Sequence, residues 1–130
     1  MANPNIVSVT AITAGTMGWN LPTGGLVNLI SPSADYLLKI NRIVVANVDT
    51  SSAADVDVAI VTNIQTMPNT TVTGADATTY LAKQISVPAN AALVITDTPI
   101  YLRAADNLQA QASAVSDLDL TITFELITAV

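Results

Sequence analysis

The 130-residue chain contains no cysteine and no histidine. Without cysteine it can form neither a disulfide nor a thiolate metal site, and it has no thiol nucleophile. Without histidine it lacks the side chain that titrates near neutral pH and serves most often in acid–base catalysis. Its one glutamate, Glu125, falls on the polar face of a predicted strand. We therefore expect no enzyme activity, no bound metal and no cofactor.

Charge is also scarce, because charged residues make up only 11% of the chain. Ten acids against four bases give a net charge of -6, and the bases are scattered along the sequence: Lys39, Arg42, Lys83 and Arg103. Such a chain is repelled by phosphate backbones and by anionic lipid, so we expect neither nucleic acid nor a membrane as a partner. Much of the surface must be neutral and polar, which suits packing against other proteins.

Long apolar runs are missing as well. No stretch approaches the roughly 18 consecutive apolar residues that a membrane-spanning helix needs. Residues 1–15 have neither a basic region nor a continuous apolar segment. We therefore expect no secretory signal peptide.

Alternation of apolar and polar residues is the dominant pattern of the sequence. In the segment 117–126 every second residue is apolar, namely Leu118, Leu120, Ile122, Phe124 and Leu126. Successive side chains of a strand point to opposite faces, so this segment predicts a half-buried strand. The same period recurs with Val56, Val58 and Ile60, with Leu81, Ile85 and Val87, and with Leu108, Ala110, Ala112 and Ala114.

The segment Tyr36–Val48 is longer and more apolar, which is typical of a central strand. We expect a bulge near Asn41 and Arg42. One face would carry Leu38, Ile40, Val44, Ala46 and Val48, and the other Ile43 and Val45. Weaker strands are predicted over Ile6–Ala14 and Leu26–Ile30, and short ones over Ala91–Thr96 and Ile100–Leu102.

Turn residues rich in Pro, Gly, Asn, Asp and Ser separate these segments, and no helical period survives. The sequence therefore predicts an all-β fold: an antiparallel β-sandwich, jelly-roll-like, with about eight or nine strands. We find no linker or repeat and expect residues 1–130 to form a single domain. Residues 1–5 are either an N-terminal arm that adds a strand to a neighbour or the frayed tip of an ordinary first strand.

Two predicted loops exceed the usual length, and long loops are often functional. They are Gly15–Gly25, with Met17 and Trp19, and Asn63–Thr79, with Met67. Trp19 is either an interface anchor or a lid on one end of the sandwich. The candidate partner-interface residues lie in these loops and at the start of the chain: Asn3, Pro4, Ile6, Val7, Met17, Trp19 and Met67.

Two other groups of residues leave alternatives open. Asp55 with Asp57, and Asp117 with Asp119, are pairs that share a strand face. If they lay on adjacent strands they could bind Ca²⁺, although a solvated face is the simpler interpretation. The three tyrosines, Tyr36, Tyr80 and Tyr101, could form a sugar-stacking platform or merely pack on strand faces.

The segment from Tyr36 to Ile127 resembles small virion proteins of tailed bacteriophages. The similar features are the strand YLLKINRIVVANVD followed by ADVDVAIV, the run TYLAKQISVPANAALVITDTPIYLRAADNLQAQASAV, and the closing strand LDLTITFELI. The resemblance implies a β-sandwich that decorates or cements a capsid.

On that resemblance we expect a protein made in the host cytoplasm without a signal peptide and bound to the capsid exterior. The expected partners are the major capsid protein and further copies of the chain, with a trimer as one oligomeric form. A tail, neck or fibre protein is the alternative within virions. A carbohydrate-binding or adhesin module is the alternative from another class.

Overall fold

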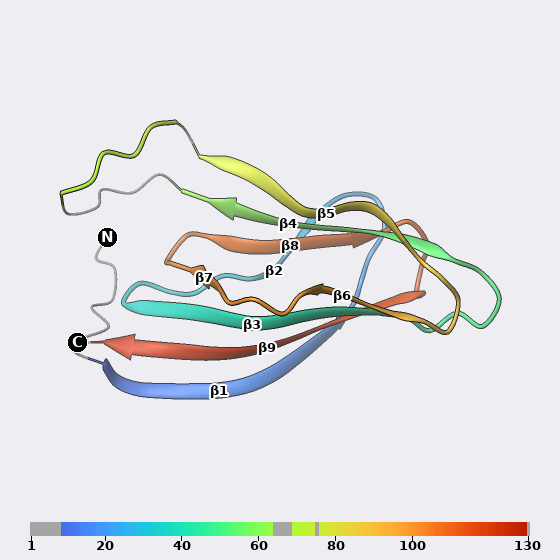
Figure 1. Ribbon diagram of the computed structural model, residues 1–130, viewed down its shortest axis with the longest axis horizontal. Helices are drawn as coiled ribbons and strands as arrows, with labels where there is room; N and C mark the ends of the chain where they lie inside the picture. Colours follow the sequence, from blue (N-terminus) through green and yellow to red (C-terminus); the bar gives the residue numbers. More distant parts are fainter. Residues whose placement is uncertain (1–8, 64–68, 75, 130) are drawn as a thin grey trace.

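The protein is a sandwich of two antiparallel sheets, described here by a computed structural model for residues 9–63, 69–74 and 76–129 (Figure 1). Within these residues there are nine strands and no helix, so no helix is long and apolar enough to cross a membrane. The strands are β1 Val9–Asn20, β2 Val27–Ile30, β3 Tyr36–Asn47, β4 Ala54–Thr62, β5 Ala77–Val87, β6 Ala92–Thr96, β7 Ile100–Leu102, β8 Asn107–Ala112 and β9 Leu118–Ala129. The all-β sandwich predicted from sequence is confirmed.

The order of the strands is that of a jelly roll. One sheet runs β1-β9-β3-β6, with β7 also pairing with β3, and the other runs β2-β8-β4-β5. The last strand, β9, lies between the first strand and β3, so the two ends of the described chain are neighbours (Figure 1). We call the first sheet the five-stranded sheet and the second the four-stranded sheet.

The core lies between the sheets and is built from the alternating residues of both. β9 follows the predicted period: Leu118, Leu120 and Ile122 are fully buried, and Phe124 and Leu126 pack against them. In the facing sheet β8 contributes Leu108, Ala110 and Ala112. Each fully buried aliphatic side chain of this kind stabilises the fold by roughly 1.5–3 kcal/mol, so the alternating faces account for the association of the two sheets.

A bulge changes the predicted faces of β3. The register with β9 shifts between Ile40 and Arg42, where the sequence predicted a bulge. Beyond it Ile43 and Val45 point into the core, and Val44 and Ala46 point outward. The prediction that Val44, Ala46 and Val48 share the face of Leu38 was therefore wrong, because a bulge adds one residue to one strand and reverses the alternation that follows it.

β5 deviates from its predicted faces for the same reason. Its register with β4 shifts twice, between Val56 and Val58 and between Val58 and Ala59. Ala82 and Val87 enter the core, whereas Ile85, predicted to be inside, is exposed. The two irregularities leave β5 without a single continuous apolar face.

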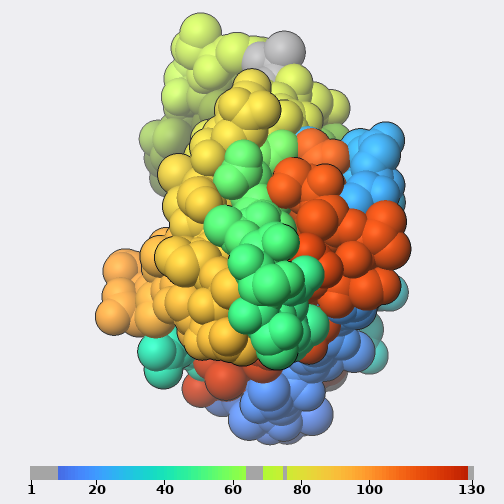
Figure 2. Space-filling view, turned by 90° about the vertical axis from the view of Figure 1, so that its right-hand side faces the viewer, coloured from blue at the N-terminus to red at the C-terminus, as the bar shows by residue number. Residues whose placement is uncertain are grey.

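Turns close one end of the sandwich. Backbone hydrogen bonds join Val48 N to Asp117 O at 2.7 Å and Asn90 N to Asp49 O at 3.1 Å, which link turns far apart in sequence. In the space-filling view of this end, the green, gold and orange-red segments pack side by side (Figure 2). The opposite end, where β1 begins and β9 finishes, contains an open cleft.

Candidate partner-binding surfaces

Two of the predicted interface residues, Met17 and Trp19, lie on a strand. The prediction of a loop over Gly15–Gly25 was wrong for its first six residues, because β1 continues to Asn20. Trp19 lies opposite Leu120 and packs against the core, and Met17 lies opposite Ile122 but is 45% exposed. β1 is at the edge of its sheet and has twelve residues against four in β2, the edge strand of the facing sheet. Met17 therefore remains accessible to a partner.

The presence of glycine at position 15 of β1 is explained by Phe124, its neighbour on β9. A Cβ atom built on Gly15 would lie 2.8 Å from Cζ of Phe124, closer than side chains tolerate. The ring of Phe124 thus occupies the space above Gly15, its cross-strand partner. Gly15, the first residue of the predicted loop, is therefore a packing requirement of the sheet.

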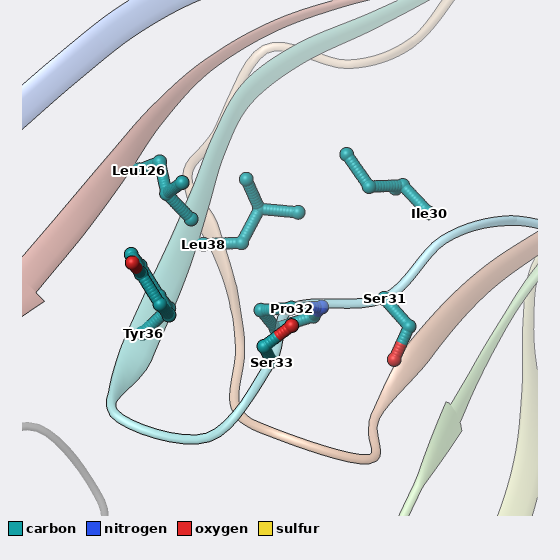
Figure 3. Close-up of a pocket in the computed structure, with 7 residues that line it drawn as sticks. All are labelled: Ile30, Ser31, Pro32, Ser33, Tyr36, Leu38 and Leu126. Atoms are coloured by element: carbon teal, nitrogen blue, oxygen red, sulfur yellow. The ribbon is translucent and has the colours of Figure 1, made fainter.

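The cleft at the open end lies between the start of β3, the end of β9 and the segment that follows β2 (Figure 3). Its volume is about 330 Å³ and its lining is mostly apolar, with Ile30, Ser31, Pro32, Ser33, Tyr36, Leu38 and Leu126. Tyr36, Leu38 and Leu126 come from the five-stranded sheet. The cleft has the size and polarity to receive apolar side chains rather than a charged ligand.

A buried carboxylate holds the turn beside this cleft. Asp106 accepts hydrogen bonds from the backbone N–H of Asn63 at 3.0 Å and from that of Arg103 at 2.9 Å. The hydroxyl of Ser31, which lines the cleft, donates to the backbone carbonyl of Asp106 at 2.6 Å. One aspartate thus connects the ends of β2, β4 and β7, which fixes one wall of the cleft.

A second, polar pocket of about 160 Å³ lies on the four-stranded sheet around Asp55 and Asp57. Asp57 accepts two hydrogen bonds of 2.6 Å, from the backbone N–H of Gln84 and from Nε2 of Gln111. Asp119 is on β9, in the other sheet, so the two aspartate pairs are not on adjacent strands as a calcium site would require. Among residues 9–63, 69–74 and 76–129, no three acidic, histidine or cysteine side chains gather as metal ligands do.

The three tyrosines do not share a face. Tyr36 lines the cleft, Tyr101 is 53% exposed on β7, and Tyr80 is on β5 in the other sheet. The ring of Tyr80 lies under the ammonium group of Lys83, whose nitrogen is 4.7 Å from the ring centre. The arrangement that a sugar-stacking platform needs is therefore absent.

The outer face of the five-stranded sheet is balanced in charge. Register and exposure place four charged side chains on this outer face: Lys39, Arg42, Asp119 and Glu125. Two bases and two acids cancel, and Lys39 forms an ion pair of 3.7 Å with Glu125. The remaining eight acids and two bases, which give the net charge of -6, lie elsewhere in the chain.

Neutral side chains make up the rest of this outer face: small ones in its middle, and larger apolar ones such as Ile12 and Ile127 towards the end where β1 begins. One row crosses four strands, from Gly18 on β1 through Thr121 and Val44 to Val94 on β6. Val94 is 44% exposed, and Thr121, on the other side of Val44 in this row, is also exposed. We call the outer surface of β1, β9, β3 and β6 the neutral face. It was missed in the sequence because it depends on which strands become neighbours.

The other candidate interface residues, Asn3, Pro4, Ile6, Val7 and Met67, lie outside the described residues. The same is true of the suggested arm over residues 1–5. Their roles stay predictions.

Comparisons with known proteins add little to this picture. No protein-family model matches the chain, and no curated protein matches it. A solved structure from work on Bacillus endospore appendages that form disulfide-linked pili is similar over 95% of this chain and 90% of that chain, with 14% sequence identity and a TM-score of 0.45. A similarity this low decides nothing about the function of the chain.

Proposed function

We propose that the chain is a non-enzymatic structural protein of a tailed-phage virion, which decorates the exterior of the capsid and binds between major capsid protein subunits. The observation that carries this proposal is the neutral face. A chain with a net charge of -6 repels other acidic surfaces, but the four charges on this face cancel. It can therefore be covered by another protein at low electrostatic cost.

The residue types of the neutral face also favour a protein partner. The middle of this face has many glycine, alanine, threonine and valine residues, which lose little side-chain conformational entropy when they are covered. A sheet face lined by such residues suits contact with another protein better than binding of a small ligand, which needs a concave site. Many identical copies on one particle would add avidity to a modest single contact. The sequence resemblance to small virion proteins supports the same function.

The experiment is quantitative mass spectrometry of particles purified from cells that make this chain. A cement protein is expected at a copy number comparable with that of the shell protein. Absence from the particle would overturn the proposal. A copy number far below that of the shell protein would overturn the capsid assignment and favour a tail, neck or fibre position.

A rebinding assay tests the face itself. Particles lacking the chain are mixed with purified protein, and occupancy is measured after sedimentation. Thr121→Glu places an acid in the middle of the neutral face and should lower occupancy at least tenfold, the effect of about 1.4 kcal/mol. Thr78→Glu adds the same charge to β5 in the other sheet and is the matched control. Equal occupancy for both variants would exclude the neutral face as the contact.

A further inference from the structure

β1 has a long edge that is open to pairing. Its twelve residues pair with β9 on one side, and among the described residues no strand pairs with its other side (Figure 1). The strand contains no charged residue and no proline, and its register shifts only near its start, between Val9 and Ala11. Natural proteins usually protect long edges with lysine, proline, bulges or short strands, because an open edge can pair with another chain.

The other edges of the two sheets carry such protection. β5 has two register shifts, and Gln84 within it has a φ of 50° and turns its backbone N–H to the carboxylate of Asp57. It also carries Lys83. β2, β6 and β7 have four, five and three residues. The contrast singles out β1 as an edge that remains able to pair.

β1 also exposes apolar side chains on both of its faces. Ile12 on the outer face is 58% exposed, and Met17 on the inner face is 45% exposed. A strand added beside β1 would cover part of both, because neighbouring strands lie only about 4.8 Å apart. Main-chain pairing and apolar burial would therefore be gained together.

We propose that β1 pairs antiparallel with β1 of a second copy of this chain, about a two-fold axis perpendicular to the sheet. A second copy is the partner that fits best, because each copy has the same unprotected edge and one contact covers both. Neither strand brings a charge to the contact, although each whole chain carries -6. A pairing that uses most of the strand forms about ten main-chain hydrogen bonds, which is the number in a typical protein interface.

The inference is independent of the virion function and adds to it. A two-fold contact closes at two copies, so it gives a dimer rather than a trimer. The five-stranded sheets of the two copies would become one continuous sheet. Their neutral faces would then form a single surface of twice the area, and the two binding sites of a dimer would act together on a particle.

The first test is the mass of the protein in solution, measured by light scattering and by sedimentation over a wide concentration range. We expect the wild type to reach twice the chain mass of 13.4 kDa as concentration rises. Ala14→Lys with Thr16→Lys places two exposed lysines in the middle of β1, where a two-fold axis brings them against the same residues of the other copy. This variant should be a monomer with an unchanged circular dichroism spectrum.

The matched control, Thr78→Lys with Ser86→Lys, adds the same charge to β5 and should remain a dimer. A wild type that stays monomeric, a trimer, or a dimer that survives the β1 lysines would each overturn the proposal.

The second test uses the absence of cysteine from the chain. A single Thr16→Cys gives each copy one thiol at the middle of β1, and a short bismaleimide should link two copies through it. Thr79→Cys on β5 is the control and should not be linked. Equal linking of both variants would contradict the assigned edge. A dimer that is linked at Thr16→Cys but is absent from particles would support the β1 pairing and overturn the virion function. A monomer that is found on particles would support the virion function and overturn the β1 pairing.

Discussion

Asn47 is one of two polar residues whose side chains are buried among the described residues, and it organises the closed end of the sandwich. Its amide group donates to the carbonyls of Ser52 at 2.9 Å and Val87 at 2.8 Å. Its carbonyl oxygen accepts from the backbone N–H of Asp49 at 2.9 Å. One side chain thus holds the end of β3, the turn that follows it and the end of β5.

We expect Asn47→Ala to lower the free energy of unfolding by about 2–3 kcal/mol, because it leaves three main-chain groups without partners at a buried position. Urea unfolding followed by circular dichroism measures this loss. Asn20→Ala is the control, since Asn20 is exposed and its amide bonds to the side chain of Asp119. It should cost less than about 1 kcal/mol. Similar losses in both variants would contradict the role assigned to Asn47.

Asp49, in the turn after β3, makes the stability of the protein depend on pH. Hydrogen bonds from the backbone N–H of Ser51, from its hydroxyl and from the backbone N–H of Ser52 hold the pKa of Asp49 below its usual value. A carboxylate whose pKa is lower in the folded state stabilises the fold above its unfolded pKa. This contribution is lost as pH falls through the folded pKa.

The wild type should therefore be more stable than Asp49→Asn at neutral pH, and the difference should shrink as the pH falls below about 4. Thermal unfolding of both proteins at a series of pH values measures it. Asp97→Asn removes a charge from another turn and controls for the change in net charge. A difference between wild type and Asp49→Asn that is constant across the series would contradict the proposed hydrogen-bonded carboxylate.

At the scale of single elements, alternation predicted strands well and predicted their ends and faces less well. The faces of β9 follow directly from the sequence because β9 has no bulge. β1 was partly mistaken for a loop because Gly15 and Gly18 are turn residues in most contexts. Glycine is required at position 15 because the ring of Phe124 occupies the space of a side chain there, and Phe124 is distant in sequence. A local pattern contains no information about such a neighbour.

The bulge in β3 gives a test of how faces are set. Asn41 is the extra residue, because Ile40 lies opposite Phe124 and Arg42 opposite Thr123. Deletion of Asn41 would restore a regular ladder with Ile43 still in the core, so we expect a folded protein. Deletion of Val44 would turn Val45 and Asn47 to solvent, because a slip of one residue exchanges the two faces. We expect that chain to be unfolded.

Two-dimensional NMR spectra test this account. We expect dispersed amide resonances for the variant without Asn41 and poorly dispersed ones for the variant without Val44. If both deletion variants fold, or if neither does, the bulge does not determine which side chains of β3 face the core.

At the scale of the whole molecule, the charge balance of the chain could be predicted from its composition, but the positions of the charges on the surface could not. The charge excess was visible at once, yet the balanced neutral face depends on β1, β9 and β3 lying side by side. The same holds for the cleft, whose lining comes from residues as distant as Ile30 and Leu126. Sites built by strand pairing cannot be derived from local patterns, because the pairing is decided by packing across the whole sandwich.

Strand order also makes the two ends of the chain one cooperative unit. β9 pairs with β1 on one side and with β3 on the other, so the core cannot be completed until the twelve residues of β9 are in place. Trp19, the one tryptophan, lies on β1 opposite Leu120 and packs against the core. Its fluorescence therefore reports the docking of β1, whereas far-ultraviolet circular dichroism reports both sheets.

We expect the two signals to change at the same urea concentration, because loss of β1 uncovers β9 and small single domains usually unfold in one step. Leu120→Ala should lower stability by about 2–5 kcal/mol and shift both midpoints together, since Leu120 is fully buried opposite Trp19 and its truncation leaves a cavity. A fluorescence midpoint clearly below that of circular dichroism would show that β1 detaches first. β1 would then be a strand that unfolds separately from the rest of the sandwich. A dimer formed through β1 would hold the strand in place, so the two midpoints should move together as protein concentration rises.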